Sequence, residues 1–523
     1  MNASVWAEAP GTVRKINFVL ILIILLAAFL YFFQLGAPTV WDNDEGQMLG
    51  SSLEMVKSGE YLTPHLNSQI YFHKPPLYAW LTALVFKLFG FTEFWGRFWA
   101  AVFGIAGVYL TYLFAKSLYN ERTGLISALI IAVSPLYIVL SRMALVDIVL
   151  TFFITLSIYF FYLGYKSPID KKWFYFMYLA MGLGTMTKGP LGILVPVLAI
   201  GLFLIIERKL SFIKEMAIVK GLALYLLVAS PWFIIETIRE GSYFLKIIFG
   251  QFLFSIYMSP MQQHPGPVYY YLFVILLGFI PWSGLFVSAI FKKPNYLLLS
   301  LFLVMLAIFS TASTKVPGYF LPAFPAMAII TGNFLDEIFN GKFKLAYYAG
   351  LIFPILFLFL TMWAITVTKI PAEYSQAAVY LQTLIILCLA GFFLAFLFSF
   401  LRPQPSWSIA TWALSIAIFF IGLIVWLLPY GENLKYTADL ASAMNGRENV
   451  AYYKTWQPPS LIFYLNRQKY PTVLKEIFDE KSLQKFLKMD SSVCYTSIDE
   501  EKKLKIPHRV IKDKAGFVAI ERR

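Results

Sequence analysis

Long apolar runs separated by short polar loops fill most of the chain. The first run is Phe18–Phe33, and the last of the series ends at Leu428. A helix needs about 20 apolar residues to cross a membrane, and these runs approach or reach that length. The pattern therefore predicts a polytopic, all-α membrane domain at residues 1–430, with about 13 transmembrane helices.

The pattern changes from Gly431 onward, where charged and apolar positions mix. Two segments there have helical periodicity, and two alternate as strands do. They are the helices Asn433–Met444 and Leu474–Leu487 and the strands Asn449–Tyr453 and Gly516–Ile520. We therefore predict a small α/β domain at residues 431–523. Since the expected number of spans is odd and the chain starts in the cytoplasm, this domain is expected to be extracytoplasmic.

Two long polar loops, residues 36–94 and 236–267, stand between the apolar runs. Loops of this length are uncommon unless they are functional, although a solvated loop capped by lipid-facing charges would have the same composition. Inside the first loop, Leu77–Phe89 is apolar but short for a comfortable span. We therefore predict that it lies along the membrane surface.

Basic residues set the expected orientation. Lysine and arginine precede the first apolar run and place the N-terminus in the cytoplasm. With Leu77–Phe89 on the membrane surface, the basic loops at 116–122 and 166–172 also fall inside. Both long polar loops then lie outside, and Asp147 shares that side with Asp44.

The composition supports a membrane protein and narrows its partners. Of the 523 residues, 59% are hydrophobic and 14% are charged, and the mean hydropathy is +0.68. The net charge of +14 is typical of nucleic-acid binding, but the basic residues fall mostly in short loops, as membrane topology requires. We therefore predict membrane lipids, and no nucleic acid, among the partners. The two cysteines cannot form a disulfide framework.

Unusual polar residues gather on the outer side of this topology, where an ionisable group is costly unless it is paired or functional. They are Asp42, Asp44, Glu45, His73, Lys74, Arg142, Asp147, Lys188, His264, Lys315 and Tyr319. Carboxylates can act as bases or hold a metal, and cations can bind a phosphate. Structural alternatives exist, since lysines can snorkel and Arg142 can pair with Asp147. The shared side favours a site for a phosphorylated, membrane-borne substrate.

Several motifs occur in a characteristic order. They are Asp44-Glu45, His73-Lys74-Pro75-Pro76-Leu77, Arg142…Asp147, Lys188-Gly189-Pro190, Ser230-Pro231-Trp232, His264-Pro265-Gly266-Pro267 and Lys315…Tyr319…Pro322. This order resembles the GT-C glycosyltransferases of the protein mannosyltransferase type, above all the bacterial aminoarabinose transferase branch that modifies lipid A. The resemblance implies a hexosyl- or pentosyltransferase that uses a polyprenyl-phosphate sugar donor. Its acceptor would be lipid A, another glycan or a protein, and transfer would proceed with inversion outside the cell inner membrane.

The resemblance also implies roles for individual residues. Asp44 would be the general base on the acceptor, or the group that orients it, with Glu45 and Asp147 as further catalytic carboxylates. Lys74 would hold the donor phosphate. The substrate-binding residues would be Lys74, Tyr71, Arg142, Lys188, Lys315 and Tyr319.

Two positions depart from that branch. It usually has Arg at the position of Gln47 and Glu at the position of His73, where the Glu can join a histidine as a metal ligand. His73 and His264 could still form a two-histidine site for a divalent metal such as zinc, which imidazole suits.

Other classes of function stay open. An inactive relative that acts as a structural partner is compatible with Gln47. A lipid or sugar transporter is expected to have inverted repeats and charges at mid-membrane depth, and the sequence shows neither. A protein O-mannosyltransferase-like enzyme would differ from the favoured interpretation in its acceptor.

Overall fold

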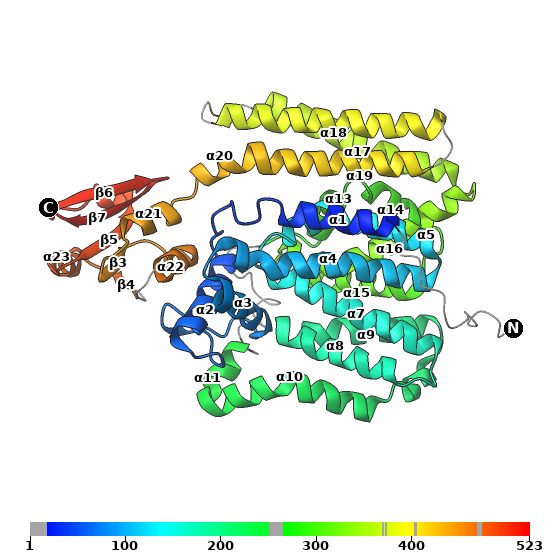
Figure 1. The fold of residues 1–523 in the computed structure, drawn as a ribbon, viewed down its shortest axis with the longest axis horizontal. Coiled ribbons are helices and arrows are strands. Elements are labelled where there is room, and N and C mark those ends of the chain that lie inside the picture. Colours follow the sequence, from blue (N-terminus) through cyan, green and yellow to red (C-terminus); the bar gives the residue numbers. More distant parts are fainter. Residues whose placement is uncertain are drawn as a thin grey trace.

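The computed structural model describes residues 18–248, 250, 265–368, 371, 374–401, 405–467 and 473–523. Most of these residues are helical, and the long helices run side by side along one axis (Figure 1). A small sheet domain stands at one end of this bundle, at the left in Figure 1. The architecture is therefore an all-α membrane domain followed by a small α/β domain, as the sequence predicts.

Most helices of the bundle contribute to one continuous apolar core. In chain order the bundle helices are α1 (Phe18–Phe32), α4 (Glu93–Leu118), α5 (Glu121–Ala132), α6 (Pro135–Leu140), α7 (Val146–Lys166), α8 (Lys172–Lys188), α9 (Leu191–Ile206), η1 (Leu210–Glu215), α10 (Ile218–Glu240), α13 (Tyr270–Gly278), α14 (Ser283–Ile290), α15 (Tyr296–Thr311), η4 (Pro317–Ala323), α16 (Phe324–Phe339), α17 (Lys344–Val367), α18 (Ser375–Leu401), α19 (Pro405–Gly422), η6 (Leu423–Leu427) and α20 (Leu428–Asn433).

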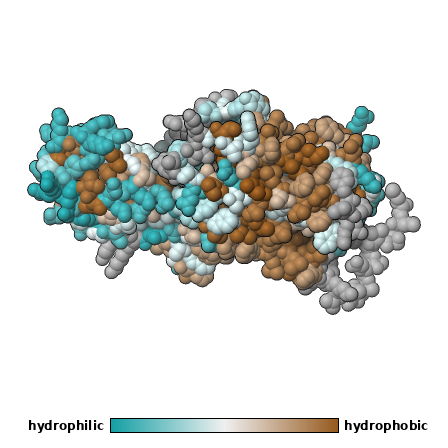
Figure 2. Space-filling view, turned by 90° about the horizontal axis from the view of Figure 1, so that it is seen from above, coloured by the Kyte–Doolittle hydropathy of each residue, from teal (hydrophilic) through white to brown (hydrophobic). Residues whose placement is uncertain are grey.

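Within the described residues, seven helices are long and apolar enough to cross a membrane. The pair α13 and α14, bent by 117° at a short break, would count as an eighth if it acts as one span. Further apolar helices, among them α1 and α9, are shorter than 18 residues. Figure 2 shows hydrophobic surface over much of the bundle and mostly hydrophilic surface over the sheet domain. The chain is thus a multi-pass membrane protein. The expected number of about 13 spans stays a prediction.

Prolines divide two continuous apolar stretches of the sequence into pairs of helices. Gly124–Leu140 forms α5 and α6, and Pro135 occupies the first position of α6. Tyr269–Phe291 forms α13 and α14, and Pro281 lies in the break between them. Proline has no N–H to donate to the preceding turn and its ring clashes there, so a helix stops before it.

The segment between α1 and α4 folds at the same end of the bundle as the sheet domain (Figure 1). It contains α2 (Asp44–Ser58), a hairpin of β1 (His65–Leu66) and β2 (Gln69–Ile70), and α3 (Leu77–Phe89). Helix α3 packs against α2, α4 and α8. The short helix α11 (Ser242–Leu245) follows α10 at this end. The first long polar loop is therefore largely regular structure.

The α/β domain holds a five-stranded mixed sheet. Its elements are α21 (Thr437–Ala443), β3 (Asn449–Tyr453), α22 (Pro459–Asn466), β4 (Leu474–Ile477), α23 (Glu480–Leu487), β5 (Ser492–Ser497), α24 (Ile498–Glu501), β6 (His508–Lys514) and β7 (Phe517–Arg522). The strand order is β4-β3-β5-β7-β6, with β3 parallel to β4 and β5, and β7 antiparallel to β5 and β6.

The structure confirms one predicted strand of this domain and contradicts one predicted helix. The strand Asn449–Tyr453 is confirmed as β3. The prediction of one helix over Leu474–Leu487 is wrong, because its first residues pair with β3 as strand β4. The helix begins only after Asp479, whose side chain caps it by accepting a 2.8 Å hydrogen bond from the N–H of Ser482. Strand pairing between distant segments overrides the local helical pattern here.

Candidate active site

Helix α2 places the first acidic cluster at the end of the bundle that carries the α/β domain. Its first turn holds Asp44 and Glu45, which suit the positive end of a helix dipole. The residue before it, Asn43, has φ 62° and ψ −122°, a backbone conformation that favours glycine. Such strain persists only where surrounding contacts hold it. The start of α2 is therefore a constrained turn, and Asp44 is its first helical residue.

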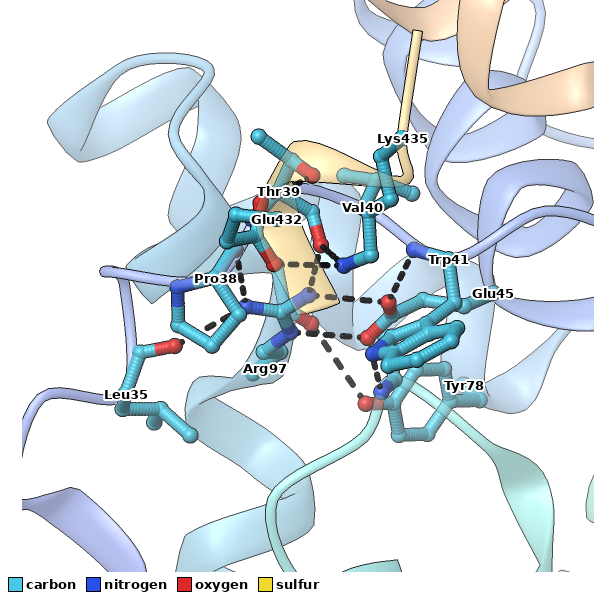
Figure 3. A network of polar contacts seen from close by, with 12 residues as sticks. Leu35, Pro38, Thr39, Val40, Trp41, Glu45, Tyr78, Arg97, Glu432 and Lys435 are labelled. Atoms are coloured by element: carbon cyan, nitrogen blue, oxygen red, sulfur yellow. Dashed lines mark hydrogen bonds and ion pairs between the residues drawn. The ribbon is translucent and has the colours of Figure 1, made fainter. Parts of the chain in front are cut away.

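Glu45 is buried in an ion pair with Arg97 of α4 (Figure 3). Arg97 Nε donates to Glu45 Oε1 at 2.8 Å, and Nη2 donates to Oε2 at 2.9 Å. The guanidinium donates its other hydrogen bonds to the carbonyl oxygens of Leu35, Pro38 and Thr39. A buried pair of this kind holds its elements together only when both charges are fully hydrogen-bonded, as they are here.

The carboxylate of Glu45 has further partners. It accepts hydrogen bonds from the N–H groups of Trp41 at 2.8 Å and Ala144 at 3.0 Å. Burial raises the pKa of Glu45, but the Arg97 charge and these hydrogen bonds more than offset it, so the net pKa is lowered. Both oxygens of Glu45 are thus engaged in joining α2 to α4 and to the start of α7.

Asp44 forms an ion pair with Lys74, which lies in the loop between β2 and α3. Lys74 Nζ donates to Asp44 Oδ1 at 2.9 Å. The Lys74 ammonium has the largest effect on the pKa of Asp44 and, with smaller contributions from Lys188 and His73, holds it below its usual range. Asp44 is therefore ionised at neutral pH.

A second ion pair belongs to the same cluster. Lys188, at the end of α8, donates from Nζ to Asp147 Oδ1 at 2.6 Å, and Asp147 lies in the first turn of α7. The Lys188 ammonium is 4.0 Å from the centre of the Tyr319 ring, a cation–π distance. Because the Lys188 charge also acts on Asp44, the two pairs form one group of two carboxylates and two ammonium ions. We call these four residues the charge cluster.

Tyr71, Gln47 and His73 border the charge cluster. The hydroxyl of Tyr71 donates to Gln47 Oε1 at 2.5 Å, and the ring centroids of Tyr71 and His73 are 4.2 Å apart. Burial lowers the pKa of His73 to about 4, with Lys74 adding to the effect and Asp44 opposing it. His73 is therefore neutral at physiological pH. Gln47 supplies a hydrogen-bond acceptor where the resembling branch supplies a cation.

Arg142 and Lys315, both predicted to bind substrate, cap the ends of helices. Arg142 donates to the carbonyl oxygens that end α1, those of Leu30, Tyr31 and Phe33. Lys315 Nζ donates to the carbonyl oxygens that end α15, those of Phe309, Ser310 and Ala312. The last carbonyls of a helix lack partners within it, so each cation completes a helix end. A substrate role for Arg142 and Lys315 stays a prediction.

The structure describes only one of the two predicted metal ligands. His73 lies beside the charge cluster, whereas His264 lies outside the described residues. Among the residues that the structure describes, no group of three or more His, Cys, Asp and Glu side chains is arranged to hold a metal ion. A structural zinc site has four ligands, and a catalytic one has three from the protein, so zinc stays a prediction.

Sequence reasoning missed Arg97, the centre of the network in Figure 3. Its side chain is 1% exposed. The signal was an arginine inside the apolar run that becomes α4, where an unpaired charge would be costly. It also missed two residues that bind Thr39, Glu432 in the last bundle helix α20 and Lys435 just after that helix.

The sequence is similar to known glycosyltransferases. Residues 73–235 match the family described as dolichyl-phosphate-mannose-protein mannosyltransferase. Over 337 residues the chain is 35% identical to an uncharacterized protein of Aquifex aeolicus, a match that covers 63% of this chain and 66% of that protein. Over 433 residues it is 27% identical to the undecaprenyl phosphate-alpha-4-amino-4-deoxy-L-arabinose arabinosyl transferase of Yersinia enterocolitica, covering 78% and 76% of the two chains.

The fold also has a close counterpart. The crystal structure of ArnT from Cupriavidus metallidurans bound to undecaprenyl phosphate superposes with a TM-score of 0.85 and 22% identity, covering 96% of this chain and 97% of that one. At this identity the likeness shows a shared fold. Together with the match of residues 73–235, it indicates a glycosyltransferase with the GT-C fold that is similar to the protein mannosyltransferases. Within that class it is similar to the bacterial aminoarabinose transferases.

Proposed function

We propose that the protein transfers a sugar from a polyprenyl-phosphate donor to a lipid A-like or other envelope acceptor, with inversion. The observation that carries this proposal is the charge cluster at one end of a membrane bundle. A transferase needs a base for the acceptor hydroxyl and a cation for the leaving phosphate, and the cluster supplies both kinds of group. The similar ArnT is bound to undecaprenyl phosphate in its crystal structure.

Lys74 is the proposed ligand of the donor phosphate, and Asp44 is the proposed base. A phosphate competes with the Asp44 carboxylate for the Lys74 ammonium, because both are anionic acceptors of charge-assisted hydrogen bonds. As Lys74 turns to the phosphate, Asp44 loses the cation that does most to lower its pKa. The pKa of Asp44 then rises, which makes it a stronger base. Donor binding and activation of the base are coupled in this way.

Asp147 and Lys188 provide a second carboxylate and a second cation beside the first pair. In the proposed step, the acceptor oxygen forms a bond to the anomeric carbon while the bond from that carbon to the phosphate oxygen breaks. The hydroxyl proton passes to Asp44, and the electron pair leaves with the phosphate. Lys74 and Lys188 stabilise the departing charge, and Asp147 orients the acceptor. A single displacement of this kind inverts the anomeric centre.

We propose that the charge cluster faces the outside of the cell inner membrane. The basic residues Lys166 and Lys172 lie at the far ends of α7 and α8, whose opposite ends carry Asp147 and Lys188. The positive-inside rule places that far end in the cytoplasm. Reporter fusions after Lys172 should therefore read cytoplasmic, and fusions after residue 431 should read external. An external reading after Lys172 would overturn the orientation.

A protein is the second candidate acceptor, and the match of residues 73–235 to the protein mannosyltransferase family favours it. Mass spectrometry of lipid A, other envelope glycans and secreted proteins, with and without this protein, separates the candidates. A sugar lost from lipid A supports the first acceptor. A sugar lost from a secreted protein supports the second.

The reaction itself is tested with purified protein in detergent, a synthetic polyprenyl-phosphate sugar and lipid A. We expect release of free polyprenyl phosphate in equal amount to the glycosylated acceptor, with the opposite anomeric configuration by NMR. Movement of the intact donor across a vesicle membrane without bond cleavage would contradict the proposal and indicate a transporter.

A further inference from the structure

The α/β domain rests directly on the helix that begins with Asp44. Helix α22 packs against α2, and Gly46 lies at the point of contact. A Cβ atom at position 46 would lie 2.5 Å from the backbone nitrogen of Ser460 and 2.8 Å from the carbonyl carbon of Pro459. These are backbone atoms, so they cannot give way unless α22 moves as a whole. Only glycine allows this approach, two residues after Asp44.

Asp42 caps α22 from across this junction. Its Oδ1 accepts hydrogen bonds from Ser460 Oγ and, at 3.4 Å, from the Ser460 N–H. Pro458, the residue before α22, makes no capping hydrogen bond with its side chain, and a carboxylate is favoured at that end of a helix. Asp42 directly precedes the strained residue Asn43. The α/β domain therefore holds the turn that leads into Asp44.

A second path joins the same parts through the Arg97 network (Figure 3). Glu432 Oε2 accepts hydrogen bonds from the N–H and the hydroxyl of Thr39, at 3.0 and 2.6 Å. Lys435 Nζ donates to the Thr39 carbonyl at 2.9 Å, and Arg97 Nη2 donates to the same oxygen at 3.0 Å. Because Arg97 also binds Glu45, these contacts run from the junction of α20 with the α/β domain to the second residue of α2.

We infer that the α/β domain positions Asp44 for catalysis, so that turnover depends on how this domain sits on α2. The inference rests on the proposed role of Asp44 as base. Asp42 and Gly46 are then positioning residues, which act through the start of α2. The cations Lys74 and Lys188 come from other elements, so a displaced α2 should impair turnover more than donor binding.

A matched pair of substitutions on α2 tests this inference. Gly46→Ala forces a Cβ against the α22 backbone, whereas Gly50→Ala on the same helix meets only the flexible end of the Leu66 side chain, at 2.7 Å. We expect Gly46→Ala to lower kcat roughly tenfold to a hundredfold, the scale of a small misplacement, with the donor KM within about twofold. Hydrogen exchange of the α2 amides after Asp44 should rise in Gly46→Ala. In Gly50→Ala both quantities should stay near the wild-type values.

Substitutions of Asp42 provide a second test, which does not depend on whether Gly46→Ala folds. Asp42→Asn keeps an oxygen that accepts from Ser460, so it should retain turnover, whereas Asp42→Ala should lose turnover and loosen the start of α2. Wild-type kcat and wild-type exchange in both Asp42→Ala and Gly46→Ala would overturn the inference. Raised exchange with unchanged turnover would instead show that α2 is held by the domain but that Asp44 is not the base.

Discussion

Lys74 Nζ and Asp44 Oδ1 lie 2.9 Å apart, joining the first residue of α2 to the loop before α3. The proposed phosphate ligand and the proposed base are therefore partners in one ion pair. A phosphate that takes the cation also changes the proton affinity of the carboxylate. Loss of Lys74 should consequently affect donor binding and turnover together.

Lys74→Ala should weaken donor binding and also slow transfer, because a fixed cation contacts the phosphate before and during bond cleavage. A charge-assisted hydrogen bond contributes about 1.5–3 kcal/mol, which corresponds to a loss of roughly tenfold to over a hundredfold. Donor titration and single-turnover assays measure the two effects. Lys87→Ala, an exposed lysine on the neighbouring helix α3, is the control. Full activity of Lys74→Ala would remove Lys74 from the site.

Lys315→Met separates a helix cap from a substrate ligand. Its ammonium donates three hydrogen bonds to the end of α15, at 2.6 to 2.9 Å. Loss of these bonds leaves carbonyls unpaired, so we expect a lower thermal midpoint of unfolding with an unchanged donor affinity. A variant with the wild-type midpoint and weakened donor binding would establish the predicted substrate role instead.

Glu45→Gln tests whether Glu45 takes part in the transfer reaction or only holds α2 in place. The substitution leaves the Arg97 guanidinium buried without its counter-charge, which costs about 3–5 kcal/mol of the free energy of unfolding. The double variant Glu45→Gln, Arg97→Met should recover part of that loss. Thermal unfolding of the wild type, Glu45→Gln and the double variant measures the loss of stability and its recovery. If Glu45→Gln keeps the wild-type midpoint but loses turnover, Glu45 takes part in the chemistry.

His73 gives the stability a pH dependence. Burial lowers its pKa to about 4 in the folded protein, against the ordinary histidine value of 6.5. As the pH falls below 6.5, this histidine becomes protonated in the unfolded chain, whereas in the folded protein it stays neutral until about pH 4. The stability that comes from neutral His73 is therefore complete above pH 6.5 and is lost between pH 6.5 and 4. Thermal midpoints across this range should fall more steeply for wild type than for His73→Asn, and parallel curves would contradict the assignment.

Much of the fold was predictable because the length of an apolar run is a local property of the sequence. The runs Phe18–Phe33 and Leu77–Phe89 correspond closely to α1 and α3. The segment Leu474–Leu487 was not predictable in the same way, since its first residues become a strand only through pairing with β3. Local periodicity does not contain that information.

The members of the charge cluster could be identified from sequence because ionisable residues are conspicuous among apolar ones. Which carboxylate pairs with which cation could not be identified from sequence. The spacing suggests Arg142 as the partner of Asp147, yet Asp147 pairs with Lys188 and Arg142 caps α1. This outcome depends on how α7 packs against α8, which a linear pattern does not show.

The central claim is that Asp44 takes the proton of the acceptor hydroxyl, and one comparison tests it most directly. Asp44→Asn keeps the shape of the side chain but removes the base, while Asp42→Asn keeps the oxygen that accepts from Ser460. With purified protein and a polyprenyl-phosphate sugar, the measurement is turnover alongside donor affinity and thermal midpoint. We predict that Asp44→Asn binds the donor yet turns over about 10²–10⁴-fold more slowly, whereas Asp42→Asn stays close to wild type. Equal turnover in the two variants, or wild-type transfer by Asp44→Asn, would contradict the account.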